Sequence, residues 1–209
     1  MHTTHLKIAL VGPPGSGKTS VLEELKTMVN PRSDILVDFL PELATVFLYN
    51  LPEELKRADH VGLRQLRLFR IQVFLEEKVT AIRRAEGRRS LLVTDRGLAD
   101  AAVYLPRKQL EFAFTKEECE KMYNNYDHVL LFEGSPQSRI DGILSSSSVR
   151  QEKNYGEISQ LERKTQEVWG KYGDRLDIIP QQDTVNAKAQ YVAEKINQRV
   201  GSDVFYIEQ

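Results

Sequence analysis

Residues 6–19 read LKIALVGPPGSGKT, an apolar run followed by a glycine-rich loop that ends in a lysine and a threonine. The run at 6–11 is short and almost wholly apolar, which is typical of a strand covered on both faces of a sheet. After the loop, residues 18–29 carry apolar side chains at intervals of three and four, and this pattern predicts a helix. The pair Asn30-Pro31 predicts its end. The stretch therefore predicts a strand, a loop and a helix in direct succession.

The loop matches the pattern G-x-x-x-x-G-K-[ST], which between a strand and a helix is typical of phosphate binding. Its glycines allow a tight turn with inward-pointing amides, and the helix N-terminus adds about half a positive charge. We expect Lys18 to reach the β- and γ-phosphates and Thr19 to bind Mg²⁺. The candidate nucleotide-binding residues of this loop are Gly12, Pro13, Pro14, Gly15, Ser16, Gly17, Lys18, Thr19 and Ser20. The alternative is a glycine-rich turn with a chance lysine, but the flanking elements favour binding of a nucleoside triphosphate.

Further short apolar runs predict the other strands of the sheet, at 35–39, 91–94, 129–132 and 176–179. Helical patterns lie at 63–86, after a capping box that begins at Thr115, at 155–172 and at 183–200. Strands that alternate with helices predict an α/β fold with a mostly parallel, doubly wound sheet of five strands. Trp169 and Tyr172 fall in the apolar pattern, so we expect them to pack in the core.

The composition limits the class of protein. The chain has 209 residues, of which 41% are hydrophobic and 28% charged, as expected for a single globular domain over residues 1–209. Lys and Arg total 29 and Asp and Glu total 30, and the resulting net charge of −1 gives no general attraction to nucleic acid. The single cysteine, Cys119, excludes an intrachain disulfide and a cysteine-based zinc site. We find neither a signal peptide nor an apolar run of membrane-spanning length, so we expect a cytoplasmic protein without membrane insertion.

A second candidate site residue is Asp95, which ends the apolar strand at 91–94. Ligands of open α/β sheets bind at the carboxyl edge, where Asp95 fits a Walker B acid that holds Mg²⁺ or acts as a base. An ordinary aspartate at a strand end is the alternative. Arg96 follows where mechanically coupled ATPases usually have a glutamate, which favours phosphoryl transfer to a small molecule. The guanine-reading motif Asn-Lys-x-Asp does not occur in the sequence.

Other charged residues carry weaker signals. Glu42 follows the second predicted strand, where a carboxylate can orient or deprotonate an acceptor hydroxyl, although it can also simply initiate a helix. Asp100 either belongs to the site or complements a helix dipole. Arg64, Arg67 and Arg70 recur every three residues. We interpret them as a solvated helix edge in preference to a phosphate-binding face.

The polar segment at about 134–156 contains four consecutive serines at 145–148, and we interpret it as a lid-like loop. It carries Arg139 and Arg150. Arginine suits transferred phosphates because its guanidinium makes paired, charge-assisted hydrogen bonds. A loop of this kind can close over a triphosphate and exclude water. The alternative is a solvated loop with ordinary surface arginines.

Several short motifs, taken in order, resemble the NadR-type AAA-like domain, a P-loop group that includes nicotinamide-riboside kinase domains. They are the phosphate loop, Glu42, TDRGLAD at 94–100, YDHV at 126–129, DG at 141–142 and RQE at 150–152. The resemblance implies a three-layer α/β/α P-loop kinase core, Mg-ATP as the phosphate donor and a closing lid. Glu42 matches the acidic position that faces the acceptor in this group.

The resemblance also implies roles for other residues. Lys18 and Thr19 match the positions that hold phosphate and Mg²⁺, Asp95 matches the Walker B acid, and Arg150 matches the lid arginine. The family places that arginine close after Asp-Gly, whereas residues 143–149 intervene here.

The favoured hypothesis is a Mg-ATP-dependent kinase that acts on a small nucleoside-like acceptor, with Lys18, Asp95, Glu42 and Arg150 as catalytic candidates and Arg139 as a further nucleotide contact. A nucleotide-dependent regulatory ATPase or GTPase switch without such an acceptor is the alternative. A binding module without turnover is a third hypothesis. By analogy, we expect the base contact in the loop at 181–184.

Overall fold

Five strands form the central sheet of the computed structural model, which describes residues 4–48, 61–135 and 154–207. The strands are β1 (His5–Val11), β2 (Ile35–Leu40), β3 (Arg89–Asp95), β4 (His128–Phe132) and β5 (Leu176–Ile179). Their order across the sheet is β2-β3-β1-β4-β5, and each neighbouring pair is parallel. The predicted parallel five-stranded sheet is confirmed, and β1, which leads into the glycine-rich loop, lies at its centre.

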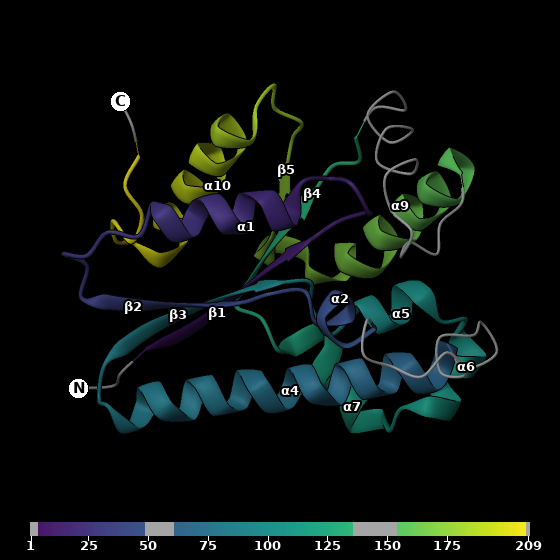
Figure 1. Cartoon of the computed structure of the whole chain (residues 1–209). Helices are drawn as coiled ribbons and strands as arrows, with labels where there is room; N and C mark the ends of the chain where they lie inside the picture. Colours follow the sequence, from purple (N-terminus) through teal and green to yellow (C-terminus); the bar gives the residue numbers. More distant parts are fainter. Residues whose placement is uncertain (1–3, 49–60, 136–153, 208–209) are drawn as a thin grey trace.

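Helices cover both faces of the sheet (Figure 1). α1 (Lys18–Thr27) and α10 (Val185–Val200) pack together on one face. The elements that share the core on the other face are α4 (Val61–Ala85), α5 (Asp100–Tyr104), α6 (Arg107–Ala113), α7 (Lys116–Asn124) and α9 (Tyr155–Trp169). The short helix α2 (Leu43–Leu48) follows β2. The expected three-layer α/β/α architecture is therefore confirmed.

The central strand explains why the sequence shows apolar runs without alternation. Ile8 and Leu10 point into the core beneath α1 and α10, whereas Ala9 and Val11 point into the core beneath α4 and α9. All four side chains are at most 2% exposed. A strand buried on both faces needs apolar residues at every position, which is typical of parallel sheets.

Two predicted helix starts agree with the structure. The hydroxyl of Thr115 accepts a hydrogen bond from the amide of Glu118 (3.2 Å), and the Glu118 carboxylate accepts one from the amide of Thr115 (2.9 Å), so the capping box is confirmed. Thr184 caps α10 by accepting a hydrogen bond from the amide of Ala187 at 3.0 Å.

The prediction of one helix over 155–172 is wrong at its end. α9 stops at Trp169, and a 3₁₀ segment, η2 (Gly170–Arg175), follows. Gly173 within this segment has a φ of 56° and a ψ of −125°, a non-helical combination with positive φ that glycine adopts without steric cost. Trp169 and Tyr172 are nonetheless 0% and 3% exposed, so their predicted place in the core is confirmed.

The interpretation of the three arginines of α4 as a solvated edge is wrong for one of them. Arg67 and Arg70 are exposed, but Arg64 is only 4% exposed. Steps of three residues rotate each successive side chain by about 60° around a helix axis, so three such residues spread over more than one face. Arg64 consequently lies on the side of α4 that packs against the protein.

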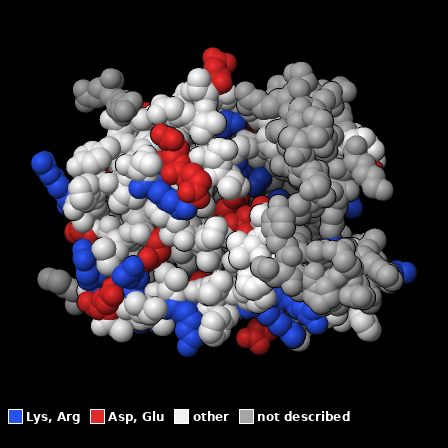
Figure 2. Space-filling view, in the orientation of Figure 1, with Lys and Arg blue, Asp and Glu red and all other residues white. Residues whose placement is uncertain are grey.

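The described surface agrees with the balanced composition. On the face shown in Figure 2, lysine and arginine side chains intermingle with aspartate and glutamate side chains. Within the described ranges, no helix has an apolar stretch long enough to cross a bilayer.

A partly exposed charge cluster joins the last strand to the last helix. Asp177 of β5 accepts two hydrogen bonds from Arg199 of α10, both at 2.9 Å, and its Oδ2 lies 2.9 Å from Nε2 of His128. The hydrogen bonds from Arg199, together with the contact to His128, hold the pKa of Asp177 below its ordinary value against the opposing effect of burial.

Replacing Asp177 by asparagine is expected to lower the free energy of unfolding by about 1 kcal/mol near neutral pH. Because its pKa is lower in the folded state, the carboxylate stabilises the fold above its unfolded pKa of about 3.9, and this contribution is lost as the pH falls further. The difference in the free energy of unfolding between the wild type and Asp177→Asn should therefore be largest at neutral pH and decrease in acid. Urea unfolding at several pH values measures it.

A matched control is Asp34→Asn, which removes a carboxylate whose ion pair with Arg89 is 64% and 41% exposed. We expect little change from it, because exposed pairs contribute little. A difference for Asp177→Asn that grew on acidification would contradict the assignment.

Candidate functional site

The loop between β1 and α1 has a backbone that only glycine allows at several points. Gly12, Gly15 and Gly17 have φ values of 148°, 79° and 92°. A Cβ atom on Gly12 would lie 2.7 Å from the carbonyl oxygen of Phe132, which is closer than such atoms approach in proteins. The loop therefore passes directly against the end of β4, and its last glycine, Gly17, is the N-cap residue of α1.

Lys18, the first residue of α1, turns back into the loop. Its Nζ donates hydrogen bonds to the carbonyls of Gly12 and Pro13, both at 2.9 Å, and to the hydroxyl of Ser16 at 3.1 Å. The side chain is buried, and burial together with the charge of Arg96 lowers the pKa of Lys18 to about 8, against the effect of nearby carboxylates. The three oxygens are uncharged, so a phosphate oxygen would be a stronger partner for the ammonium group.

Asp95 lies beside this loop because β3 pairs with β1. In that pairing Asp95 is opposite Leu10, two residues before the loop begins. Its Oδ2 accepts a hydrogen bond from the hydroxyl of Thr19 at 2.6 Å. Its Oδ1 is buried and has no hydrogen-bond partner in the part of the chain that the structure describes. Burial raises the pKa of Asp95, although Lys18 and the hydrogen bond from Thr19 oppose the change.

The pair Thr19 and Asp95 fits a magnesium ion. Mg²⁺ prefers oxygen ligands and is often bound by one carboxylate, a hydroxyl, water and substrate phosphates. A buried carboxylate oxygen without a donor is an acceptor that a cation satisfies. Across residues 4–48, 61–135 and 154–207, no three His, Cys, Asp or Glu side chains cluster in a way that suits a metal held by the protein alone. The donor set therefore suits a metal that shares its coordination with a bound phosphate.

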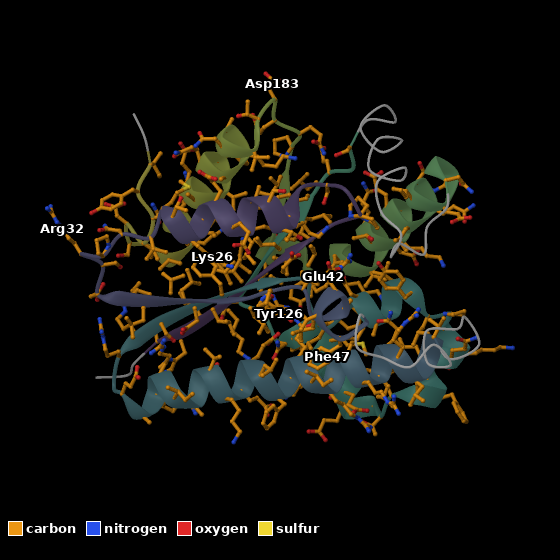
Figure 3. The ribbon with its side chains drawn as sticks, in the orientation of Figure 1. Lys26, Arg32, Glu42, Phe47, Tyr126 and Asp183 are labelled. Atoms are coloured by element: carbon orange, nitrogen blue, oxygen red, sulfur yellow. The ribbon has the colours of Figure 1, made fainter. Side chains whose placement is uncertain are left out.

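An ion-pair cluster lies next to Asp95. The guanidinium of Arg96 donates from Nε to Glu42 and from Nη1 to Asp100, the latter at 3.2 Å. Asp100 also accepts a hydrogen bond from the indole of Trp169 at 2.9 Å. Glu42 lies just before α2, between the helix layers in Figure 3. The predicted candidates Glu42 and Asp100 thus come together at the carboxyl edge through Arg96, which was not predicted as a site residue.

Glu42 is held in its ionised form. Burial alone would raise its pKa, but the charge and the hydrogen bond of Arg96, with smaller contributions from Thr45 and Lys18, lower the pKa of Glu42 to about 2. A carboxylate of this kind is a good hydrogen-bond acceptor at neutral pH and a weak base.

Two further contacts on the glycine-rich loop were not predicted. Ser135 donates a hydrogen bond to the carbonyl of Gly15 at 2.7 Å, and the buried Lys188 of α10 donates to the carbonyl of Ser16 at 3.2 Å. Lys188 also donates to Oε1 of Gln181 at 3.0 Å. The sequence does offer one indication that Lys188 is buried. It lies four residues before Val192, on the apolar stripe of α10, where a lysine is unexpected.

The remaining sequence candidates are placed as follows. Pro13 and Pro14 are buried in the loop, and Ser20 is exposed on α1. Arg139 and Arg150, with most of the predicted lid, lie outside the described residues. The side-chain Nε2 of Gln181 donates to the carbonyls of Glu133 and Gly134 at 2.6 and 2.8 Å, so the loop after β5 lies beside the end of β4.

Comparisons with known proteins agree with this arrangement. A family model described as an AAA domain matches residues 7–187. Among solved structures, a NadR protein in complex with NR superposes with a TM-score of 0.68 at 13% identity, over 98% of this chain and 54% of the other. The present chain thus spans about half the length of that protein. A deoxyadenosine kinase from M. mycoides matches at a TM-score of 0.49 and 15% identity, over 92% of this chain and 99% of the other. No curated protein sequence matches the chain significantly.

A parallel α/β/α sheet with a glycine-rich loop after its central strand and a strand-end aspartate beside that loop is the arrangement of a P-loop protein. The family match extends over most of the length. The chain belongs to this AAA domain family, and the predicted resemblance to a NadR-type domain is confirmed.

Proposed function

We propose that the protein is a Mg-ATP-dependent kinase that transfers the γ-phosphoryl group to a hydroxyl of a small nucleoside-like molecule. In the reaction, the acceptor oxygen forms a bond to the γ-phosphorus while the bond from that phosphorus to the bridging oxygen of ADP breaks. The hydroxyl proton leaves to Glu42 or to solvent. Such transfers depend mainly on positioning and on charge, because little covalent work falls on the protein.

The residues of the loop supply the donor side. Its amides and the ammonium group of Lys18 bind the triphosphate, and Lys18 exchanges its carbonyl partners for phosphate oxygens. Thr19 and Asp95 hold Mg²⁺, which when bound supplies positive charge at the phosphate oxygens. The contact of Thr19 with Asp95 supports this pairing.

Glu42 is proposed to orient the acceptor. With its pKa at about 2, it stays ionised and can accept a hydrogen bond from the attacking hydroxyl. It is a poor proton store at neutral pH, which is compatible with a loose transition state in which the hydroxyl loses its proton late.

One observation carries the choice of acceptor class: Arg96 is bound by two carboxylates. The trio of Glu42, Arg96 and Asp100 therefore has a net charge of −1, and its guanidinium is already paired. The negative charge of a phosphomonoester at this place would be repelled by the two carboxylates, because the guanidinium of Arg96 is already paired with them. A neutral or cationic nucleoside would not be repelled. The arrangement supports a nucleoside acceptor over a nucleoside monophosphate.

The experiment is an ADP-release assay with Mg-ATP and a panel of nucleosides, including nicotinamide riboside, each paired with its 5′-monophosphate. We expect ADP release that depends on the acceptor, with kcat/KM for a nucleoside at least about tenfold above that for its monophosphate.

The other outcomes contradict the proposal in distinct ways. Preference for monophosphates would overturn the acceptor class. Slow phosphate release without an acceptor would favour the regulatory ATPase or GTPase switch, and tight nucleotide binding without turnover would favour a binding module.

A further inference from the structure

Arg96 has an unusual backbone conformation. Its φ is 79°, and among the residues that the structure describes it is the only one other than glycine with a positive φ. Such a conformation costs a residue with a side chain about 1–2 kcal/mol. A strained backbone conformation persists only where surrounding contacts hold it. The hydrogen bonds around Arg96 therefore show which residues keep it in this conformation.

Hydrogen bonds hold the strained segment on both sides. The amide of Arg96 donates to the carbonyl of Leu10 at 2.9 Å. Its carbonyl accepts from the hydroxyl of Thr94 at 2.8 Å and from Nε2 of Gln72 at 3.2 Å. Two residues later, the amide of Leu98 donates to the hydroxyl of Tyr126 at 3.0 Å. Gln72 thus attaches the segment to α4, and Tyr126 attaches it to the connection between α7 and β4.

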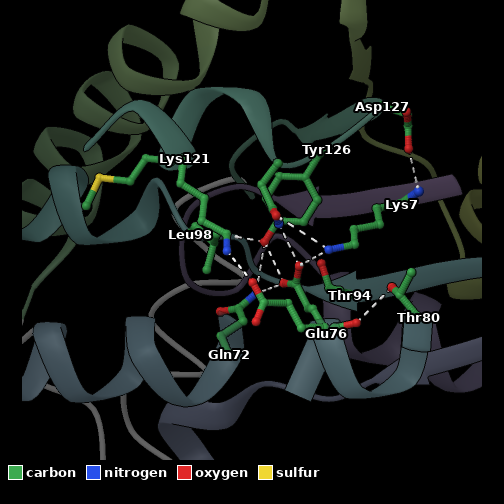
Figure 4. A network of polar contacts seen from close by, with 12 residues as sticks. Lys7, Gln72, Glu76, Thr80, Thr94, Leu98, Lys121, Tyr126 and Asp127 are labelled. Carbon is green, nitrogen blue, oxygen red and sulfur yellow. Dashed lines mark hydrogen bonds and ion pairs between the residues drawn. The ribbon is translucent and has the colours of Figure 1, made fainter. Parts of the chain in front are cut away.

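A fully buried carboxylate fixes both of these side chains (Figure 4). Glu76 of α4 is 0% exposed, and its Oε1 accepts from the hydroxyl of Tyr126 at 2.8 Å and from Gln72 at 3.0 Å. Its Oε2 accepts from Asn125 at 2.6 Å and from Lys7 at 3.4 Å. A buried carboxylate with these donors has little freedom, because moving it would leave polar groups unpaired.

Aromatic rings also pack closely against the same segment. A Cβ atom on Gly97 would lie 2.4 Å from Trp169 and 2.9 Å from Tyr126. Trp169 also holds Asp100, one of the two partners of Arg96. The network therefore reaches both Arg96 and one of the carboxylates that Arg96 binds.

We infer that Glu76, Gln72 and Tyr126 are positioning residues for the acceptor site: they hold Arg96 in its left-handed conformation and so aim its guanidinium at Glu42 and Asp100. This inference rests on the proposed kinase function. None of the three side chains needs to touch the substrate. They act through Arg96, and none of their hydrogen bonds in the described structure reaches the glycine-rich loop.

Gln72→Met tests the inference, because it keeps the side-chain length and removes the donor to Arg96. We expect kcat/KM for the acceptor to fall about tenfold while the dissociation constant for Mg-ATP changes less than about twofold. In an Arg96→Lys background, the same substitution should lower kcat/KM by less than about threefold, because a residue that acts through Arg96 has no further effect once Arg96 is changed. Equal effects in both backgrounds would overturn the inference.

The matched control is Asn197→Ala on α10, on the opposite face of the sheet. The buried Asn197 makes hydrogen bonds of 2.9, 2.9 and 3.0 Å to residues 204 and 205. It should lower the melting temperature without lowering kcat/KM for the acceptor in the folded protein. A similar loss of kcat/KM in this control would show that general destabilisation explains the result for Gln72→Met.

A second measurement is independent of turnover. Hydrogen exchange of the protein without ligands should be at least about fivefold faster at residues 96–98 in Gln72→Met and in Tyr126→Phe, and unchanged at 12–17. If the wild type shows no acceptor-dependent turnover, the proposed function fails, and this exchange measurement alone decides the positioning role. Unchanged exchange at 96–98 would overturn that role.

Discussion

Replacing Lys18 by alanine is expected to lower Mg-ATP turnover by about 10³-fold and to weaken binding of the nucleotide. The ammonium group lies inside the glycine-rich loop, where it already contacts two carbonyls and a hydroxyl. Alanine removes this buried cation from the place where the phosphates would lie. Stopped assays of ADP formation and calorimetric titration with ATP measure the two effects.

Lys26→Ala is the control for this change. Lys26 lies on the same helix, is exposed and pairs with Glu23 three residues earlier. We expect wild-type turnover from it, since it is remote from the loop. Turnover of Lys18→Ala at the wild-type rate would mean that the triphosphate does not bind where we place it.

Asp95→Asn is expected to lower kcat by about 10²-fold and to raise the Mg²⁺ concentration needed for half-maximal activity. Asparagine retains the shape of the side chain and an oxygen that can accept from Thr19, but it removes the charge of a carboxylate whose Oδ1 lacks a donor in the described structure. Magnesium titrations at saturating ATP separate the change in metal affinity from the change in rate.

The control is Asp127→Asn, which removes a carboxylate at the opposite edge of the same sheet. Asp127 immediately precedes β4 and accepts a hydrogen bond from the amide of Lys7 at 2.8 Å. Its loss is expected to leave the dependence on magnesium unchanged. A wild-type magnesium dependence in Asp95→Asn would remove this residue from the metal site.

The local parts of the fold and site could be predicted from the sequence. The run at 6–11 and the loop after it follow from apolar composition and glycine spacing within a few residues, and the capping box at Thr115 is equally local. These features depend on neighbours along the chain, which a single sequence displays.

Features that join distant segments could not be predicted in this way. The pairing of Glu42 with Arg96 requires β2 and β3 to be neighbours, which apolar runs do not indicate. Glu76 and Lys188 are charged residues on helices and resemble solvent-exposed positions, yet both are buried in polar networks. The predicted helix extended three residues beyond the end of α9 at Trp169, because Trp169 and Tyr172 continue the helical spacing and a glycine such as Gly170 costs a helix only about 1 kcal/mol.

The close approach of Gly12 to the carbonyl of Phe132 means that the glycine-rich motif would not keep its loop conformation if it were moved into another protein. The backbone at the end of β4 lies directly against the glycine-rich loop, and Ser135 just beyond it donates a hydrogen bond to the loop as well. A strand, loop and helix transplanted into another sheet would lack these contacts and would relax to a different curvature. The shape of the loop thus depends on the end of β4 as well as on the eight consecutive residues of the motif.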